Sequence, residues 1–452
     1  MENGFNTPFL LRQHTPIIHF QPDQFGATLR GTELKPKFDR YLVKKAFGDE
    51  FDQVKFFLVG YNPMKEKDIK KRYDKGYRAL DYSLTITPGE VWRYPIELER
   101  IQHGRLFLHR RTGKPVRDGF PCFFGNMGDD NQQRPKLFCS SFDDIKVDIF
   151  STRKELSDLI AKHFSGFIHT HNFGTRQTKG FGSFSLVRMK EGKPSVKYQR
   201  GLYYFDVDVK VKTSNDNSLK NEDNIRFPNQ PADIKALRLL DNLREVFTQI
   251  DLFHKVIKSG YNARGGYVKS SIFAFCKDVL NIQWDKRTIK QHFFLPELED
   301  QKFDRPNSDV LHYENEENKS GRDRHFLIRD LLGLTSEASW RAYRANISKE
   351  HPYIERFPSP IVYKPIKLGK DTYRVNIFLR AIPKEMLNTT FSIKKNNDRR
   401  KLLLDTPESF SLIDYFDYLV GDRFNIHHMV DGQNDDTQRI VNIFNNLQKN
   451  KR

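Results

Sequence analysis

The stretch from residue 172 to residue 186 has the residue types and spacing of a phosphate-binding loop. It reads Asn-Phe-Gly-Thr-Arg-Gln-Thr-Lys-Gly-Phe-Gly-Ser-Phe-Ser-Leu, so that Gly174, Gly180 and Gly182 bracket Arg176 and Lys179. Glycine adopts backbone angles that other residues avoid and lets another backbone come close. Such a loop can present bare N–H groups beside two cations, which is a chemistry suited to phosphate. A glycine-rich hairpin that binds nothing is the alternative interpretation.

Two common nucleotide-binding motifs do not fit this loop. The dinucleotide fingerprint requires a strand, then glycines, then a helix, whereas a strand-like run follows the glycines here. The Walker loop requires Gly-Lys-Ser/Thr, whereas Gly180 is followed by Phe181 and Gly182. The loop therefore indicates phosphate contacts of another kind.

The elements that position this loop can be predicted from the flanking residues. Thr152 to Glu155 fit a capping box, and apolar residues continue at helical spacing to Phe164. We expect this helix to be followed by a short strand over residues 166–170, then by the basic glycine loop and a further strand.

The N-terminal region predicts a second basic helix. Residues 9–20 have the pattern of an opening strand interrupted at Pro16, and residues 27–43 have apolar side chains at helical spacing. Pro36 is tolerable in a first turn. Four cations lie on or just before this helix: Arg30, Lys35, Lys37 and Arg40.

Taken together, these segments resemble the RAMP family (repeat-associated mysterious proteins), the RNA-binding subunits of CRISPR systems. In that family the first strand commonly ends in a Thr-Pro-hydrophobic phrase, matched here by Thr15-Pro16-Ile17. The next helix opens with a phrase like Arg-Gly-Ser-Leu-Lys, matched by residues 30–35, and a glycine loop enters the last strand of a ferredoxin-like domain. The resemblance covers about residues 9–45 and 152–190 and is thin elsewhere.

The predicted fold class is α+β, a ferredoxin-like RAMP domain with insertions followed by a helix-rich half. Alternating residues predict strands at 79–86, 144–150 and 202–211, and the irregular stretch 113–134 is read as an insertion. We divide the chain into an N-terminal domain (1–212), a polar linker (213–231) and a C-terminal domain (232–452).

The C-terminal domain begins with the strongest helical pattern of the chain. Helices are expected at 233–258, 267–280 and 326–334, with a plain connector at 260–267 and a strand at 373–379. A second, degraded ferredoxin-like unit in this half is one interpretation. The basic stretch from Lys65 to Lys75 is read as a solvated helix face, with a dedicated RNA contact as the alternative.

Composition favours a polyanionic partner. Lysine and arginine number 76 against 58 acidic residues, giving a formal net charge of +18, and the pI is near 9.5; this is the footprint of a nucleic-acid-binding protein. Three isolated cysteines argue against disulfides and zinc sites. With no apolar run of membrane-spanning length and no signal peptide, a cytoplasmic protein without metal or cofactor is expected.

Enzymatic readings rest on few residues. A metal-independent CRISPR RNA-processing endoribonuclease would use a histidine, and His14, His19, His169 and His171 lie near the implied RNA surface. Family enzymes of that kind usually carry the glycine loop close to the C-terminus, whereas this chain continues well beyond it. Asp23 is the one early acidic residue that could assist metal-dependent cleavage. No paired carboxylate or phosphate-loop motif supports nucleotidyl transfer.

The leading interpretation is a non-catalytic guide (CRISPR) RNA-binding subunit of a type III effector complex in antiviral defence. The resemblance is strongest to the terminal subunit of type III-B complexes, near the 3′ end of the guide. It implies guide RNA, other RAMP subunits and target RNA as partners. The processing endoribonuclease and an unrelated basic nucleic-acid-binding protein are the alternatives. We expect the loop at 174–182 and the four cations at 30–40 to form two walls of one RNA groove.

Overall fold

The computed structural model describes most of the chain and divides it into two compact units. The first unit comprises Met1–Lys197, Val207–Thr248 and Tyr363–Asn376, and the second comprises Tyr198–Asp206, Gln249–Val362 and Ile377–Arg452. Within them the described residues are 5–19, 28–95, 98–102, 105–106, 108, 110, 113, 117–118, 120–122, 137–187, 202–209, 225–226, 234–263, 265–294, 310–313, 324–340, 343–369 and 371–450.

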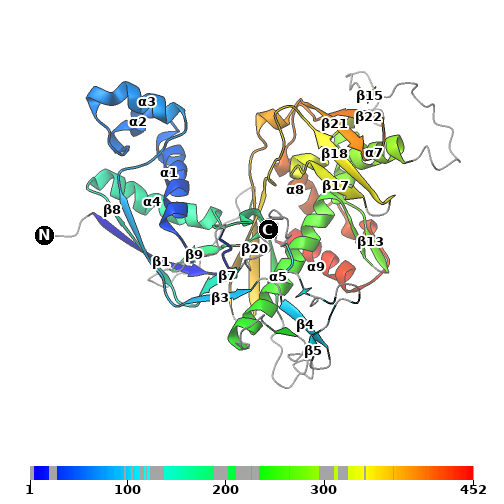
Figure 1. Ribbon diagram of the computed structural model, residues 1–452, viewed down its shortest axis with the longest axis horizontal. Coiled ribbons are helices and arrows are strands. Elements are labelled where there is room, and N and C mark those ends of the chain that lie inside the picture. The colour runs from blue at the N-terminus through cyan, green and yellow to red at the C-terminus, as the bar shows by residue number, and fades with distance from the viewer. Residues whose placement is uncertain are drawn as a thin grey trace. The chain divides into compact units, whose positions relative to one another are not determined.

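The first unit is built on a four-stranded antiparallel sheet of order β2-β8-β1-β9 (Figure 1). Its strands are β1 (Asn6–Gln13), β2 (Ser83–Thr87), β8 (Ile145–Phe150) and β9 (Phe184–Leu186). Helix α1 (Gly31–Phe47) follows β1, and helix α4 (Lys154–Thr170) follows β8. The strand-helix-strand unit occurs twice, and each time the helix connects a central strand to an outer strand of the sheet. This is the ferredoxin-like topology. The predicted α+β class and RAMP-like domain are confirmed.

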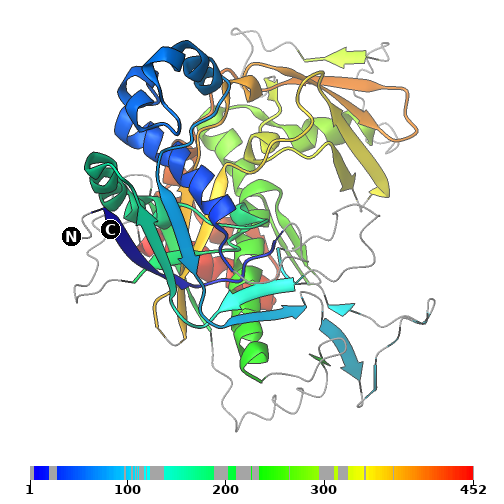
Figure 2. The same ribbon diagram turned by 60° about the vertical axis from the view of Figure 1, so that its left-hand side comes forward.

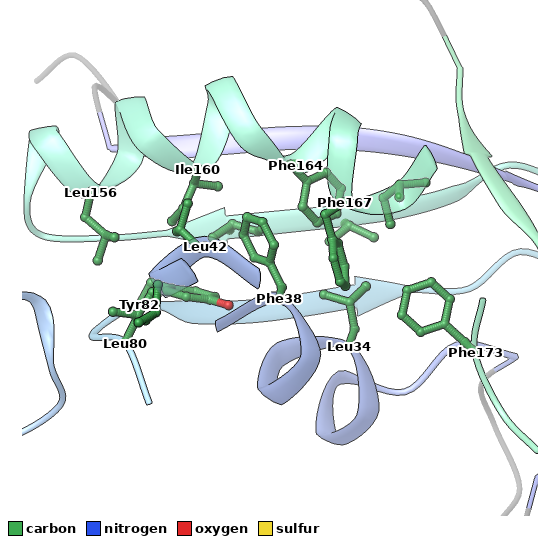
Figure 3. Packing of buried hydrophobic residues seen from close by; sticks show 14 of the residues in the cluster. Leu34, Phe38, Leu42, Leu80, Tyr82, Leu156, Ile160, Phe164, Phe167 and Phe173 are labelled. Atoms are coloured by element: carbon green, nitrogen blue, oxygen red, sulfur yellow. The ribbon is translucent and has the colours of Figure 1, made fainter. Parts of the chain in front are cut away.

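The core of this unit lies between one face of the sheet and the two helices. Strand β8 alternates buried and more exposed residues, as a sheet with one covered face requires. Phe38 of α1 packs against Phe164 and Phe167 of α4, with ring centroids 5.1 and 5.0 Å apart (Figure 3). Figure 2 shows α1 and α4 on the same side of the sheet. The aromatic residues at helical spacing therefore fix both helices on the sheet.

Two local predictions around α4 were wrong. The expected short strand at 166–170 is the last turn of α4, because Phe167 and Ile168 are buried on its core-facing side and the Thr170 hydroxyl donates to the Gly166 carbonyl at 2.9 Å. The expected capping box is absent as well. Arg153 is the N-cap and makes no side-chain capping bond.

Insertions enlarge this unit. Between α1 and β2 lie α2 (Phe51–Val54) and α3 (Glu66–Asp74), and between β2 and β8 lie the paired strands β3 (Val91–Pro95) and β7 (Leu137–Ser141). A further sheet contains β4 (Leu98–Gln102), β5 (Arg105–Leu106), β6 (Arg117–Asp118) and β11 (Ile225–Arg226). Most of the predicted insertion at 113–134 and of the predicted linker at 213–231 lies outside the described residues, so both boundaries stay predictions.

Three strands with residues in both units form a sheet of order β10-β20-β19. They are β10 (Tyr203–Asp208), β19 (Ile361–Lys367) and β20 (Thr372–Leu379), and helix α5 (Ile234–Lys258) follows β10 in the chain. In chain order β10, β19 and β20 correspond to the first, second and third strands of a ferredoxin-like sheet, and they are arranged in space as first, third and second, as in that fold. The described residues supply no fourth strand to this sheet. It is the arrangement expected of a degraded second ferredoxin-like unit.

The second unit also holds a seven-stranded sheet of order β14-β16-β22-β21-β18-β17, with β15 paired to β22. These strands are β14 (Gln283–Trp284), β15 (Val310–His312), β16 (His325–Phe326), β17 (Glu337–Trp340), β18 (Ala345–Glu350), β21 (Thr390–Lys395) and β22 (Lys401–Asp405). Its helices are α6 (Ser271–Phe275), α7 (Asp285–Phe293), α8 (Leu412–Val420) and α9 (Asp435–Lys449). Phe253 of α5 packs against Phe444 of α9 at 5.2 Å.

Three expectations for this unit need correction. The segment expected as a connector forms the hairpin β12 (Tyr261–Ala263) and β13 (Gly266–Val268), which is extended by β23 (Val430–Asp431). Consequently the helix expected at 267–280 starts later, at Ser271, and continues as a π-helical turn to Leu280. The expected helix at 326–334 is reduced to a 3-10 turn, Arg329–Leu332, after strand β16.

Candidate RNA-binding site

The glycine-rich loop is a compact turn anchored by its apolar residues. Asn172 and Ser183 form a β-bridge at its base, and the Phe173 N–H donates to the Gly182 carbonyl at 2.9 Å. Phe173 and Phe181 are fully buried, and Phe181 stacks on Phe247 with centroids 4.2 Å apart. The loop is thus held in one conformation by packing before any ligand binds.

Two of the glycines are required by close packing. Gly182 has φ +67°, and a Cβ placed on it would lie 1.8 Å from the Phe173 carbonyl oxygen. Gly174 has φ +83°, and its Cβ would lie 2.5 Å from Cγ1 of Ile17. Both positions therefore exclude a side chain for reasons internal to the fold.

The expectation that this loop presents bare N–H groups is wrong at many of its positions. Gly174 donates to the Glu33 carboxylate at 2.6 Å, Thr175 to the Ile18 carbonyl at 2.7 Å, and Gly182 to the Pro16 carbonyl at 2.9 Å. The loop N–H groups that the protein itself pairs are those of Phe173, Gly174, Thr175, Lys179, Gly180, Gly182 and Ser183. Phosphate affinity at this loop must therefore come mainly from its side chains.

The start of α1 lies directly against the loop, as predicted. Glu33 accepts from the Gly174 N–H, and the Lys37 ammonium pairs with Glu33 at 2.7 Å and donates to the Asn172 carbonyl at 3.3 Å. Lys37 also lies 5.0 Å above the centre of the Phe173 ring. Chain segments about 140 residues apart thus form one surface, and the predicted juxtaposition of the two segments is confirmed.

The predicted cations fall into two groups. Arg30 is the N-cap of α1, Lys37 touches the loop, and Arg40 is exposed on the same helix. In the loop, Lys179 is partly exposed, whereas Arg176 is half-buried in a left-handed conformation with φ +55°. Burial lowers the pKa of Arg176, although a guanidinium stays charged at neutral pH.

Lys35 belongs to neither wall. Its ammonium donates to the Leu80 carbonyl at 2.7 Å and to Asp39 at 3.0 Å, and it lies 3.7 Å above the Tyr82 ring centre. These contacts direct the side chain toward the residues before β2. The structure therefore does not bring Lys35 to the loop.

A buried lysine that the sequence reading missed supports the loop from below. Lys364 is fully buried and donates to the His171 carbonyl at 2.7 Å and to Oδ1 of Asn172 at 3.3 Å. Asn172 in turn donates to the carbonyls of Gln177 and Tyr363. Burial lowers the pKa of Lys364 to about 7. The sequence feature that could have revealed this residue is a lysine between apolar residues in strand β19.

The histidines considered as catalytic groups are packed into the structure or bonded to its backbone. His14 accepts from the Lys367 N–H through Nδ1 at 3.1 Å, so its Nε2 carries the proton and donates to Ser185 at 2.7 Å. Burial, with help from the Lys364 charge, lowers the pKa of His14 to about 3. His19 is buried; burial lowers the pKa of His169. His171 Nδ1 lies within hydrogen-bond distance of the Phe167 carbonyl.

The remaining catalytic and membrane hypotheses gain no support. Asp23 lies outside the described residues. Among the residues that the structure does describe, no group of three or more His, Cys, Asp or Glu side chains is placed to hold a metal ion. In the same part of the chain, no helix has the length and apolar character to cross a membrane.

Two family models match nearly the whole chain. The Cmr1 N-terminal domain matches residues 4–261, and the Cmr1 C-terminal domain matches residues 267–449. No curated protein matches the sequence. Among solved structures, one chain of a type III-B Cmr-beta complex bound to cognate target RNA, studied by cryo-EM, is similar with 12% identity and a TM-score of 0.24. That match covers 41% of this chain and spans 59% of the solved chain's length.

Proposed function

The chain belongs to the Cmr1 family, whose members are RAMP proteins, and on this premise we propose that it binds guide RNA as a non-catalytic subunit of a type III CRISPR effector complex. Other RAMP subunits and target RNA would be its partners in the assembled complex. Its place near the guide 3′ end and its cytoplasmic location are parts of the same proposal.

One observation carries the proposal. A rigid glycine loop at the entry to the last strand of a ferredoxin-like sheet lies against the cationic start of α1. Arg30 and Lys37 stand on one side of this junction, and Arg176 and Lys179 on the other. Their charges are presented by a framework fixed by buried aromatic rings and by Lys364, so little conformational entropy is lost when a phosphate binds.

The chemistry of the site fits backbone recognition. Lysine and arginine side chains neutralise phosphates but carry no sequence information, so binding should be tolerant of sequence and sensitive to salt. Both ring nitrogens of His14 are occupied by hydrogen bonds and burial lowers its pKa to about 3, so this histidine is not poised to move a proton at neutral pH. This supports a binding role over the processing endoribonuclease.

The test is RNA binding by the full chain carrying Arg176→Ala and Lys179→Ala. We expect weaker binding to every RNA sequence, and a salt dependence whose slope falls by about 1.4, or two single-strand phosphates. The matched control is Lys154→Ala with Lys162→Ala, which removes two exposed positive charges from α4 in the same unit. Equal affinity and slope for the loop variant and the wild type would contradict the proposal.

A further inference from the structure

The insertion between α1 and β2 carries a basic and aromatic surface that a ferredoxin-like fold does not need. Such a fold needs only a connection between the first helix and the second strand, yet this chain places α2 and α3 there, and their buried residues extend the core of the unit. Phe51 and Tyr73 pack edge to face at 5.4 Å within it. The insertion is therefore an ordered element whose outer surface is free to acquire a role.

The outer surface of this insertion is richest in cations at the C-terminal end of α3. Lys71, Arg72 and Lys75 are exposed, and no ion pair involving them is found in the described part of the chain. Tyr77 follows with 62% of its surface exposed, and the Arg72 guanidinium lies 5.5 Å from the centre of its ring. An exposed ring beside free cations is a stacking platform for a nucleic-acid base.

Helix α1 connects this surface to the glycine loop. Its N-terminal end touches the loop through Lys37, and its C-terminal end leads into the insertion (Figure 1). Lys37, Arg40 and Lys44 are three and four residues apart, so they share one face of the helix. Arg40 and Lys44 are exposed.

The far end of this stripe adjoins the insertion. Arg78 donates to Asp49 at 2.9 Å and stacks 3.6 Å above Tyr73, the buried tyrosine of α3. These contacts, led by the Arg78 hydrogen bond, lower the pKa of Asp49, and Lys44 is among the charges that act on it. Lys44 is thus close to the junction of α1 with the α3 segment, and positive charge extends from one end of α1 to the other.

We propose that an RNA strand leaving the glycine loop follows Lys37, Arg40 and Lys44 along α1 and makes a second contact at Arg72, Lys75 and Tyr77. This rests on the proposed function, since the loop is taken as the first contact. Helix α1 has 17 residues and a length of about 25 Å. At roughly 3.4 Å per stacked nucleotide, the two contacts are about seven nucleotides apart.

Single-stranded RNA is the occupant that these observations favour. The second contact pairs an exposed aromatic ring with two cations, and the stripe leading to it is positive. Favourable interaction with the helix dipole explains part of the cation excess at the end of α3, but it does not explain an exposed tyrosine or the stripe on α1. A dimerisation or subunit-docking surface is the outcome to be distinguished by experiment.

The test compares RNA lengths on the full chain by fluorescence anisotropy. Oligouridines of about four nucleotides reach only the loop, whereas those of about fifteen reach both contacts. The triple variant Arg72→Ala, Lys75→Ala, Tyr77→Ala should bind the long RNA about tenfold more weakly and the short one normally. The matched control, Met64→Ala with Lys65→Ala and Lys67→Ala, removes two exposed charges and an exposed apolar side chain from the same insertion. It should change neither affinity by more than about twofold.

The outcomes separate this inference from the proposed function. An unchanged affinity of the triple variant for the long RNA, or an equal loss for short and long RNA, overturns the second contact. If Arg176→Ala with Lys179→Ala leaves the binding of both RNAs unchanged, or if the wild type binds neither RNA, the loop site itself fails and both proposals fall. A triple variant that binds RNA normally but no longer assembles with a protein partner would assign the surface to protein docking instead.

Discussion

Replacing Gly182 with alanine tests whether this glycine is fixed by packing inside the loop. The new Cβ would stand 1.8 Å from the Phe173 carbonyl oxygen, whereas real Cβ atoms stay beyond 3.0 Å, so the two must separate by about 1.2 Å. That movement breaks the hydrogen bonds from Phe173 N–H to Gly182 and from Gly182 N–H to the Pro16 carbonyl, both 2.9 Å long. Each bond contributes about 1 kcal/mol.

The left-handed backbone adds a cost of about 1 kcal/mol for any L-residue with a side chain. Together these terms predict that Gly182→Ala lowers the free energy of unfolding by about 3 kcal/mol. Gly48→Ala is the matched control in the same unit, because Gly48 has φ +60° but no atom within 4 Å of its Cβ position. It should cost about 1 kcal/mol.

Urea unfolding of both variants, followed by circular dichroism, measures the two losses. Equal losses would show that backbone strain alone explains the glycine and that the close contact with Phe173 contributes nothing. The result also governs how RNA binding by Gly182 variants is read. A Gly182→Val protein that fails to bind RNA has lost its loop fold, so the Arg176 and Lys179 variants are the cleaner probe of phosphate contact.

Three further predictions concern the groups around the loop. Burial lowers the pKa of Lys364 in the folded protein to about 7, against 10.5 in the unfolded chain. Because the unfolded chain binds more protons between these two pH values, the free energy of unfolding of the wild type should rise with pH there, by up to about 1.4 kcal/mol per pH unit. Urea unfolding of Lys364→Met from pH 7 to 9 should lack that rise. His14 has a pKa of about 3 in the folded protein, against 6.5 in the unfolded chain, so the free energy of unfolding should decrease as the pH falls below 6.5. If the free energies of unfolding of the wild type and of His14→Gln depend on pH in parallel, this prediction is wrong. Repeat RNA incubated with the full chain, with or without a divalent metal, should stay intact; cutting that His14→Ala abolishes would restore the processing-nuclease reading.

The sequence predicted the fold best where one residue pattern had one structural meaning. Alternation in residues 145–149 and helical spacing in residues 34–42 and 156–164 gave the strands and helices of the first unit. The resemblance carried by Thr15-Pro16-Ile17 and residues 30–35 implied a ferredoxin-like domain, and in that topology the first strand-helix turn and the loop entering the last strand lie at the same end of the sheet. The short strand expected at 166–170 is helical because Phe167 and Ile168 pack into the core as part of α4, and Gly166, which faces Tyr41, is tolerated inside this packed helix.

The site was predicted only in part, because its remaining groups act through contacts between distant segments. Glu33 and Lys364 hold the loop through bonds to residues more than 130 positions away, and no local pattern announces such pairing. The prediction for Lys35 was wrong for the same reason. Its sequence neighbours suggested a place in the RNA groove, but its ammonium is bound by the Leu80 carbonyl and by Asp39. The pairing of the Gly174, Thr175 and Gly182 N–H groups could not be foreseen either, since their acceptors are Glu33, Ile18 and Pro16, which are distant in the sequence.

Crosslinking of photoreactive single-stranded RNA to the full chain, followed by peptide mapping, shows which residues the RNA contacts. We expect crosslinks in the loop at residues 172–182 and in the α1 segment at residues 30–44, both lost at high salt because phosphate contacts dominate binding. Crosslinks confined to one of these segments would contradict a shared site. Crosslinks found only in other parts of the chain would contradict the assignment of the glycine loop as the RNA-binding site.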